Sequence, residues 1–377
     1  MTSNYKICTK CVCDTSIPGI SFDDIGICNF CTIHDEMEKQ YPIDESQESK
    51  LNSIVKKIKI DGKNREYDCI IGVSGGTDSS YLLYTAIQLG LKPLAVHYDN
   101  GWNSSLAVTN IKNITKKLNV DLFTYVNDWE EFKDLQLSFL KASTSDAEIP
   151  TDVGIHGCLL RVASKMKIKY VLNGHSFRNE SMMPIGWTYM DGRYINSIQK
   201  QFGKIKLRTF PNVTIFDYVF YSFFKRIKVV PILNYLVYDK IDAIKIMEKE
   251  LNWTYSGGHH HESYYTHFFQ SYLLPTKFKI DKRIPELSGF IRTHQKTREE
   301  SLKELKTPYP FDTELINYTI SKLDITKSEF EEILKLPIKT FHDYKTYYRY
   351  IKMLRFPIWL AAKVGIIPYV LYQKFFT

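Results

Sequence analysis

A short apolar strand that runs through two glycines into a helix constrains this chain more than any other feature. The stretch is YDCIIGVSGGTDSSYLLYTAIQLG, and the helix is expected to start near Asp78. Three further apolar strands follow at KPLAVHYDNGW, VDLFTYVND and KIKYVLNGHS, with helical stretches at 105–118 and around 156–167 between them. Strands that alternate with helices predict an α/β fold with a doubly wound parallel sheet.

The rest of the chain divides around this sheet. We expect a zinc-binding ribbon over 1–40, a linker helix over 41–66, the sheet domain over 67–230 and a helical region over 231–377. Apolar periodicity places the helices of the last region, and prolines mark breaks between them. The expected helices are 238–251, 263–273, 297–306, 313–321, 326–335 and 343–353.

Four of the seven cysteines form two C-x-x-C pairs near the N-terminus. Cys8 and Cys11 are separated from Cys28 and Cys31 by 16 residues, which falls within the C-x2-C-x15–20-C-x2-C zinc template. Four thiolates close a tetrahedral shell, so the site would be structural. The alternative is four ordinary thiols. The remaining donors nearby, Cys13 and His34, are not expected to be ligands.

The turn SGGTDSS between the first strand and its helix is suited to bind a phosphate. Glycine lets the backbone approach an anion, and the first amides of a helix attract one. The hydroxyls add donors, whereas the carboxylate is repelled by phosphate and is assigned to Mg²⁺ or to ordering the loop. The predicted binding residues are Ser74, Gly75, Gly76, Thr77, Asp78, Ser79 and Ser80. The alternative is a glycine turn without a ligand.

Two later strand ends support a nucleotide site, because ligands of parallel sheets bind at the carboxyl ends of the strands. Asp99 ends the second strand, and Gly174 and His175 end the fourth. The turn is neither a Walker A loop nor G-x-G-x-x-G. It resembles the S-G-G-x-D-S signature of the PP-loop ATP pyrophosphatases. That resemblance implies binding of ATP with Mg²⁺, its cleavage to AMP and pyrophosphate, and adenylation of a carbonyl oxygen.

A second resemblance covers nearly the whole chain. The cysteine pairs, the PP-loop, GGHHHESYYTHFFQSYLLPTKFKIDKR and THQKTREESLKEL together resemble the N-acetyl sugar amidotransferases of bacterial surface-glycan synthesis. This family converts an acetamido group of a sugar into an acetamidino group, with ammonia from a separate glutaminase subunit. The resemblance implies an activated N-acetyl sugar and a glutaminase as partners, and no nucleic acid.

The run GGHHHES has three alternative interpretations. The spacing of a metalloprotease helix, H-E-x-x-H, is absent, which disfavours a metal cage. A surface loop with exposed histidines is the second interpretation. We prefer a substrate loop in which His260 and Glu262 reach the reacting group and deprotonate ammonium or orient the amide.

Basic and polar residues after this run complete the predicted site. Lys277 is a candidate catalytic residue, and Lys282 and Arg283 are candidates for the phosphates or an acidic sugar. Thr266 and Gln270 are further candidate substrate contacts. A solvated basic face is the alternative for the three cations.

Net charge and composition say little about what this chain binds. The net charge of +8 is expected to be spread along the chain. The polar N-terminus shows no export signal, so we expect a cytoplasmic protein.

The aromatic stretch DYVFYSFFKRIKVVPILNYLVYD is expected to be buried rather than a docking surface. The C-terminal RFPIWLAAKVGIIPYVLYQKFFT is expected to pack as a helix, with a weak membrane-surface contact as the alternative.

Two rival functions remain. A PP-loop tRNA thiolase requires a reactive cysteine pair beside the ATP site, and only Cys158 lies near. A non-catalytic zinc-ribbon interaction protein would not need an intact SGGTDSS turn.

Overall fold

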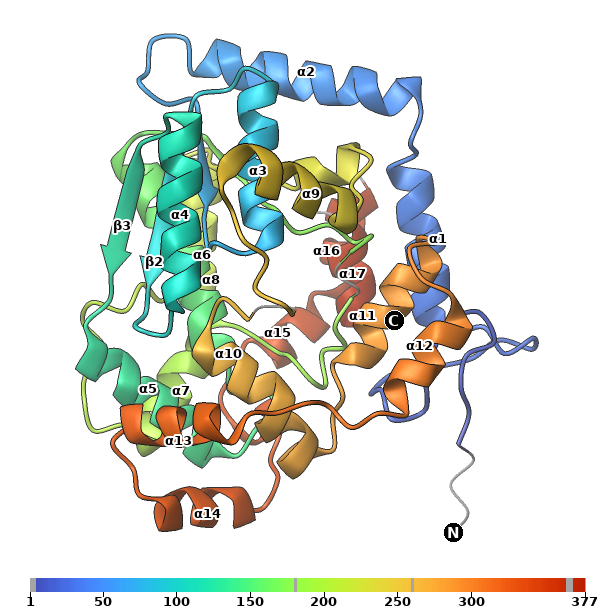
Figure 1. Ribbon diagram of the computed structural model, residues 1–377, viewed down its shortest axis with the longest axis vertical. Helices are drawn as coiled ribbons and strands as arrows, with labels where there is room; N and C mark the ends of the chain where they lie inside the picture. The colour runs from blue at the N-terminus through green and yellow to red at the C-terminus, as the bar shows by residue number, and fades with distance from the viewer. Residues whose placement is uncertain (1–4, 180–181, 259–260, 364–368, 377) are drawn as a thin grey trace.

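The computed structural model describes residues 5–179, 182–258, 261–363 and 369–376 (Figure 1). Its centre is a five-stranded sheet in the order β3-β2-β1-β4-β5, and every neighbouring pair is parallel. The strands are β1 (Cys69–Gly72), β2 (Pro93–Asp99), β3 (Leu122–Val126), β4 (Tyr170–Leu172) and β5 (Lys228–Val230). The predicted α/β class with a parallel sheet is therefore confirmed.

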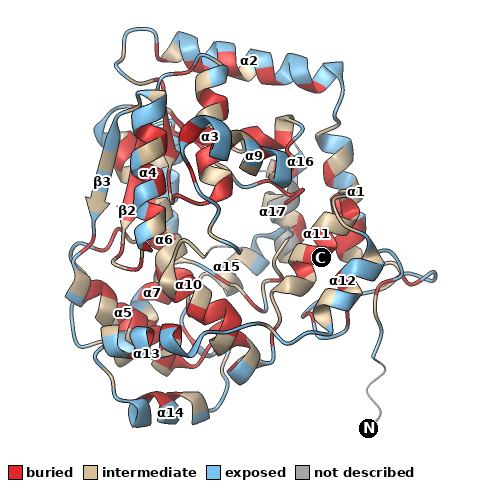
Figure 2. Ribbon diagram, viewed as in Figure 1, coloured by how far each residue is buried: buried red, intermediate tan, exposed pale blue. Residues whose placement is uncertain are grey.

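Helices cover both faces of the sheet because its central strands alternate their side chains. In β1, Cys69 and Ile71 pack into one apolar cluster and Ile70 packs into another. The first cluster is covered by α2 (Glu45–Asp61), α3 (Thr77–Gln88), α4 (Ser105–Leu118) and α9 (Lys240–Leu251). The second is covered by α6 (Ile149–Lys165). All strand side chains of β2 except the last are buried, as Figure 2 shows in red.

A third and larger core lies beyond the carboxyl ends of the strands. In Figure 1 the strands point down toward α5, α7, α10 and α13. Large aromatic side chains fill this core, among them Trp102, Tyr194, Tyr265 and Phe268. Its elements are α5 (Trp129–Ala142), α7 (Gly192–Phe202), α10 (Tyr264–Phe268), η3 (Phe269–Phe278), α13 (Thr313–Lys322) and α14 (Lys327–Lys335).

The N-terminal cysteine segment shares this core and lies beside two C-terminal helices. Figure 1 shows α1 (Asn29–Gln40) next to α11 (Arg283–Arg292) and α12 (Arg298–Leu305). The remaining elements are α8 (Ile215–Val219), η1 (Phe220–Phe224), η2 (Ile232–Tyr235), η4 (Phe341–Asp343), α15 (Tyr348–Met353), α16 (Arg355–Lys363) and α17 (Tyr369–Phe376). In the described part of the chain, no helix combines the length and apolarity needed to cross a bilayer.

Three expectations from the sequence need correction. The fifth strand, β5, was not predicted, because it has three residues only and they are mostly exposed. Helix α11 was missed because Pro285 and Gly289 interrupt its periodicity. The aromatic stretch was expected to be buried, but no residue of α8 or η1 is buried, whereas Ile232, Leu233 and Tyr238 in its second half are.

Candidate functional site

The loop between β1 and α3 is held in place from three directions. Gly75 has a φ of +82°, and a Cβ there would lie 2.5 Å from the carbonyl oxygen of Ala107. Only glycine fits this position, since it tolerates positive φ and leaves room for the neighbouring backbone. The carbonyl of Gly75 accepts hydrogen bonds from Trp253 Nε1 at 2.9 Å and from Asn110 Nδ2 at 3.2 Å. The glycine turn is therefore a fixed part of the fold.

Serine hydroxyls brace the inside of this loop. Ser79 Oγ accepts a hydrogen bond from Ser74 N at 3.2 Å, and Ser74 Oγ accepts one from Gly76 N at 3.3 Å. Helix α3 starts at Thr77, so its first amides have no partner within the helix. Amides and hydroxyls thus converge at one helix start, which is suited to bind an anion. Four predicted loop residues are buried: Gly75, Gly76, Thr77 and Ser80.

Glu262 lies directly on this loop although it is 188 residues away in the chain. Its Oε1 accepts a hydrogen bond from Ser74 Oγ at 3.2 Å, and a Cβ on Gly76 would come within 2.5 Å of that same oxygen. Its backbone carbonyl accepts a hydrogen bond from Ser104 N at 2.9 Å. A bridge between Asn103 and Ser263 extends this contact. The segment after β2 therefore pins the start of α10 against the β1–α3 loop.

Asp78 and Gly174 also meet at this loop. Tyr238 donates its hydroxyl hydrogen to Asp78 Oδ1. A Cβ on Gly174 would lie 3.2 Å from the carbonyl oxygen of Asp78, so the segment after β4 packs against the first turn of α3. In that segment, His175 N donates to Asn173 Oδ1 at 3.1 Å. The strand end at Gly174 therefore lies beside the β1–α3 loop.

Asp99, at the end of β2, takes part in a chain of polar contacts. Its Oδ1 accepts hydrogen bonds from Gly101 N at 2.9 Å and from Asn103 Nδ2 at 3.0 Å. Asn103 Nδ2 also contacts His97 Nε2 at 3.1 Å, while His97 Nδ1 contacts the Val73 carbonyl at 2.8 Å. Since a carbonyl only accepts, Nδ1 of His97 carries the proton and Nε2 accepts. This fixes the orientation of the loop after β2.

The three predicted cations after α10 do not form a solvated basic face. Lys277 is buried, and its Nζ donates to the carbonyls of Ile333, Leu334 and Leu336 at the end of α14. Burial lowers the pKa of Lys277 to about 8. In this conformation the ammonium group caps a helix, so we leave Lys277 out of the catalytic set proposed below.

The other two cations are paired with carboxylates. Lys282 Nζ lies 3.7 Å from Glu148 Oε2, and both side chains are mostly buried. Arg283 pairs with Asp281 at 2.6 Å and also donates to the Thr307 carbonyl at 3.0 Å. Thr266 and Gln270 are buried beside them in α10 and η3. Their predicted roles as substrate contacts stay predictions.

The histidine run is described only in part. His260 lies outside the described residues, so its predicted role stays a prediction. His261 stacks on His267, with 3.6 Å between the ring centroids and 19° between the planes. Among the described residues, metal-ligating side chains gather in groups of three or more only at the four cysteines. The geometry of the described part therefore gives no support to a metal cage at His261, Glu262 and His267.

The four predicted cysteines do come together. The sulfurs of Cys8, Cys11, Cys28 and Cys31 all lie within 4.8 Å of one another, and all four residues are fully buried. The sulfurs of Cys8 and Cys31 are 3.9 Å apart, and Cys28 Sγ lies 3.7 Å from both Cys11 Sγ and Cys31 Sγ. Four sulfurs at the ~2.3 Å Zn–S distance of a tetrahedral site lie about 3.8 Å apart. The residues therefore fit Zn²⁺, with all four positions filled by protein and none open for catalysis.

Helices α11 and α12 surround this cluster with arginines that the sequence did not reveal. Arg292 donates to the sulfurs of Cys31 at 3.3 Å and of Cys11 at 3.4 Å. Arg298 donates to the backbone carbonyls of Cys11 and Cys8, each at 3.0 Å. A guanidinium offsets the negative charge of four thiolates around a divalent ion. The stretch THQKTREESLKEL thus contributes to the cysteine site.

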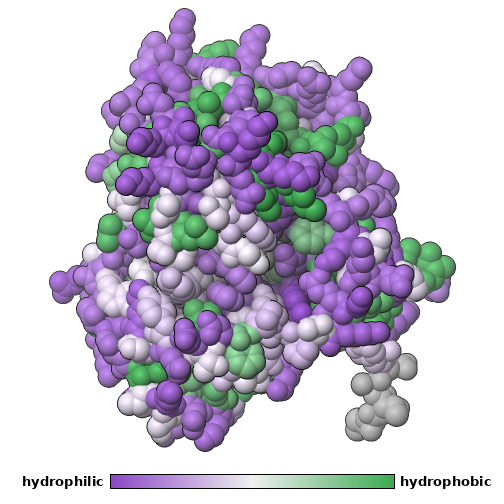
Figure 3. Space-filling model, in the orientation of Figure 1, coloured by the Kyte–Doolittle hydropathy of each residue, from purple (hydrophilic) through white to green (hydrophobic). Residues whose placement is uncertain are grey.

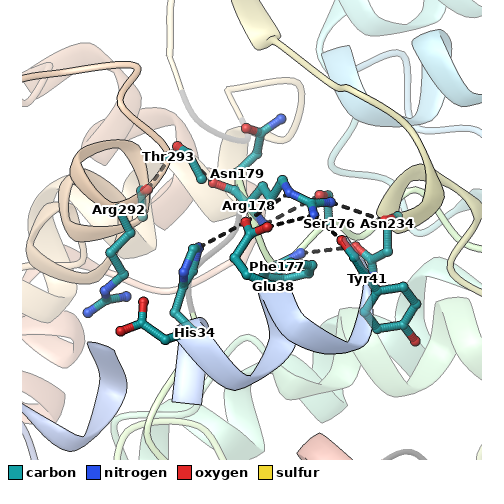
Figure 4. A network of polar contacts seen from close by, with 12 residues as sticks. His34, Glu38, Tyr41, Ser176, Phe177, Arg178, Asn179, Asn234, Arg292 and Thr293 are labelled. Atoms are coloured by element: carbon teal, nitrogen blue, oxygen red, sulfur yellow. Dashed lines mark hydrogen bonds and ion pairs between the residues drawn. The ribbon is translucent and has the colours of Figure 1, made fainter. Parts of the chain in front are cut away.

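A buried arginine, Arg178, joins the cysteine segment to the loop after β4 (Figure 4). Its Nε and Nη2 donate to the two carboxylate oxygens of Glu38 in α1, at 3.0 and 2.9 Å. Nη2 also donates to the Tyr41 carbonyl at 2.6 Å, and Nη1 donates to the Asn234 carbonyl at 3.1 Å.

Burial and the charge of Arg292 lower the pKa of nearby His34 to about 4, so His34 is neutral.

One family and one curated relative match parts of this chain. Residues 262–356 match the family model described as "LPS biosynthesis protein WbpG-like, C-terminal domain". The curated "Uncharacterized protein MJ1599" of Methanocaldococcus jannaschii is 29% identical over 157 residues, which cover 41% of this chain and 53% of that protein. The chain therefore spans about half the length of the curated relative it matches.

Three solved structures resemble this one over larger parts of the chain. A predicted subunit of tRNA methyltransferase from Methanocaldococcus jannaschii has a TM-score of 0.30 at 12% identity and covers 48% of this chain and 75% of its own. NMN synthetase from Francisella tularensis has a TM-score of 0.29 at 15% identity, and the likeness covers 58% of this chain and 96% of that one. NH3-dependent NAD synthetase from Campylobacter jejuni has a TM-score of 0.28 at 14% identity, and the likeness covers 70% of this chain and 99% of that one. Likenesses at these scores carry no argument about activity.

Proposed function

We propose that this chain is an ATP-dependent enzyme of surface-glycan biosynthesis that converts an acetamido group of an N-acetylated sugar into an acetamidino group. One observation carries the proposal: Glu262, the first residue of the WbpG-like match, lies on the β1–α3 loop with its carboxylate 3.2 Å from Ser74 Oγ. The segment related to lipopolysaccharide biosynthesis and the anion-binding loop thus form one site.

The proposed reaction has two steps. The amide oxygen of the sugar attacks the α-phosphorus of ATP, pyrophosphate leaves, and an O-adenylated imidate forms. Ammonia then adds to the imidate carbon, the oxygen leaves with AMP, and an amidine and a proton remain. An amide carbonyl is a poor electrophile because its nitrogen donates into it, so adenylation provides the leaving group that the second step needs.

The residues of the loop have distinct roles in this proposal. The amides at the start of α3 and the hydroxyls of Ser74 and Ser79 bind the departing pyrophosphate. Asp78 and Glu262 are the carboxylates suited to hold Mg²⁺, which supplies positive charge against the triphosphate. In this proposal Glu262 also takes a proton from ammonium as it approaches the imidate.

The proposal also includes a structural metal, a source of ammonia and a sugar acceptor. Zn²⁺ at the four cysteines would have a structural role, because its coordination shell is closed. Ammonia is supplied by a separate glutaminase, and the acceptor is an activated N-acetyl sugar. We place the reaction in the cytoplasm.

The rival tRNA thiolase has little support. Its chemistry needs a reactive thiolate near the ATP site, and Cys158 in α6 is fully buried. Burial raises the pKa of Cys158 to about 12, so its thiol stays protonated at neutral pH. A non-catalytic role is disfavoured by the braced loop, since nothing in an inert turn requires Glu262 at Ser74.

Replacing Glu262 with Gln tests the proposal. The purified chain is incubated with ATP, Mg²⁺, ammonium and a panel of activated N-acetyl sugars, and AMP is followed by chromatography. We expect AMP formation at saturating ammonium to fall by about 10²–10⁴-fold in the variant, the usual contribution of a positioned acid or base. Mass spectrometry of the sugar should show NH in place of the carbonyl oxygen.

Two results would contradict this assignment. Unchanged AMP formation in E262Q would remove Glu262 from the mechanism. Pyrophosphate release by the wild type without any change in sugar mass across the panel would keep the ATP site but reject the amidine product. Glu250→Gln is a matched control, because Glu250 is a carboxylate in α9 that contacts Tyr84 rather than the loop.

A further inference from the structure

A row of exposed aromatic side chains forms an unusual surface on α8 and η1. Phe216, Phe223 and Phe224 are 77%, 68% and 76% exposed, and Phe220 and Ile215 are also exposed. A folded chain rarely leaves neighbouring large apolar groups in water without a use for them. The capping box of Thr214 and Asp217 fixes the start of this helix, so the row is held in one orientation.

A second exposed apolar surface lies on α15 and α16. Met353 and Phe356 are 78% and 69% exposed, and Leu354 and Leu360 are about half exposed. The two surfaces are joined through the start of α7. Tyr347 N, just before α15, donates to Asp191 Oδ2 at 2.7 Å, and Asn212 Nδ2, just before the cap of α8, donates to the Gly192 carbonyl at 2.9 Å. In Figure 1, α15 and α16 lie toward the far side of the molecule, and the largely hydrophilic face in Figure 3 is the near side.

Both surfaces are strongly basic. Residues 215–230 and 345–363 contain eight Lys and Arg and one Asp, so they hold seven of the net charge of +8. All eight cations are exposed. The single acid, Asp217, accepts hydrogen bonds from Thr214 N and Oγ1 at 2.8 and 2.7 Å within the capping box.

We propose that the surface formed by α8, η1, α15 and α16 docks on an anionic lipid bilayer. Protruding aromatic and aliphatic groups enter the boundary between headgroups and acyl chains, and lysines and arginines bind the lipid phosphates. Apolar insertion and basic attraction together give stable attachment where either one alone gives weak binding. A partner protein would need an extended acidic face to match eight cations, whereas an anionic membrane supplies that charge everywhere.

This inference is independent of the proposed reaction, because none of these residues belongs to the β1–α3 loop or the cysteine cluster. The contact is peripheral, since no described helix is able to span the bilayer.

Vesicle flotation with the full-length chain tests the proposal. The vesicles are phosphatidylcholine alone or phosphatidylcholine mixed with phosphatidylglycerol. We expect binding to the mixed vesicles only, and weaker binding as salt increases. Two variants address the two components: F223S with F224S removes apolar insertion, and K225Q with R226Q and K228Q removes charge. Each lysine or arginine contributes about fivefold to binding, so the triple variant should bind on the order of a hundredfold more weakly.

Matched controls come from α2 and the turn after it. I60S removes an exposed apolar side chain, and K56Q with K57Q and K63Q removes the same three charges elsewhere. Both controls should float with mixed vesicles as the wild type does, and all variants should keep the wild-type melting temperature within about 2 °C.

Three outcomes would overturn the proposal. The first is no binding of the wild type to mixed vesicles. The second is an equal loss in the α2 control, which would mean unspecific charge attraction. The third is a dimer, seen by light scattering, that F223S with F224S dissociates while vesicles bind nothing. That result would assign the surface to a second copy of this chain.

Discussion

The cysteine cluster and the β1–α3 loop are the two proposed ligand sites of this molecule, and they are built in opposite ways. All donors of the cluster are side chains within residues 8–31, and their four sulfurs already have the spacing of a tetrahedral site. The loop offers backbone amides and hydroxyls, and it is completed by Glu262 and Trp253 from far along the chain. A site whose donors lie close together in the chain is predictable from their spacing. A site completed by distant residues is predictable only in its local part.

The two sites also differ in what supports them. The loop rests on the sheet core and on Trp253, so its shape does not depend on a ligand. The cysteine segment has only short bridges between Ile7 and Asp14 and between Phe22 and Cys28, and it relies on contacts with other segments. A metal ion should therefore stabilise the cysteine segment strongly, and a nucleotide should affect the folding of the loop little.

Of the changes that distinguish the two sites, removal of the metal from the cysteine cluster should have the largest effect. A structural Zn²⁺ supplies on the order of 10 kcal/mol of folding free energy to a segment without its own core. We expect Cys28→Ser or a strong chelator to abolish zinc content and to expose α1 to hydrogen exchange, while the sheet strands stay protected. Metal analysis and exchange mass spectrometry measure both quantities.

Cys158→Ala is the matched control, because Cys158 is equally buried but lies in α6 outside the cluster. It should keep one zinc per chain. Unfolding of the sheet together with the cysteine segment after chelation would show that the two regions are one cooperative unit, contrary to the comparison.

Replacing Gly75 with Ala should destabilise the β1–α3 loop, by less than metal removal destabilises the cysteine segment. A Cβ at φ +82° costs about 1–2 kcal/mol, and its approach to 2.5 Å from the Ala107 backbone adds about 1–3 kcal/mol. We expect a loss of about 2–5 kcal/mol in unfolding free energy and at least tenfold weaker ATP binding, with zinc content unchanged. Denaturant titration and calorimetry are the measurements.

Gly257 provides the control for backbone strain alone. Its φ is +83°, and a Cβ there would meet nothing within 4 Å. Gly257→Ala should cost only the conformational part, about 1–2 kcal/mol. Equal losses in the two variants would mean that the fit of Gly75 against Ala107 contributes nothing.

The sequence predicted the parts of both sites that are local. The C-x-x-C pairs identified all four cluster cysteines, and the strand–glycine–helix pattern located the loop and the parallel sheet. Arg292 and Arg298 were missed, because an arginine in a helix gives no sign that it will contact cysteines more than 260 residues earlier. Tyr238 and Arg178 were missed for the same reason.

Other failures came from patterns that allow two structures. An apolar aromatic run is typical both of a core helix and of an exposed docking helix, and only the fold shows that α8 and η1 are exposed. Lys277 was predicted to be a catalytic residue, with a solvated basic face as the alternative, yet its ammonium group caps α14. Hydrophobicity and charge give residue types, but burial is decided by the elements that pack above them.

Arg178→Lys tests whether the two regions communicate, and its expected effect is the smallest. Arg178 binds Glu38 in the cysteine segment with two hydrogen bonds and follows Gly174 and His175 in the loop against α3. Lysine keeps the charge but loses the fork, so we expect a loss of about 1–2 kcal/mol in stability. The KM for ATP should rise a few-fold, while kcat and zinc content stay near wild type. Arg65→Lys, which changes an arginine bound to the Lys167 carbonyl, is the control. An unchanged KM would show that the β4 loop keeps its place without the cysteine segment, and the two sites would then be independent.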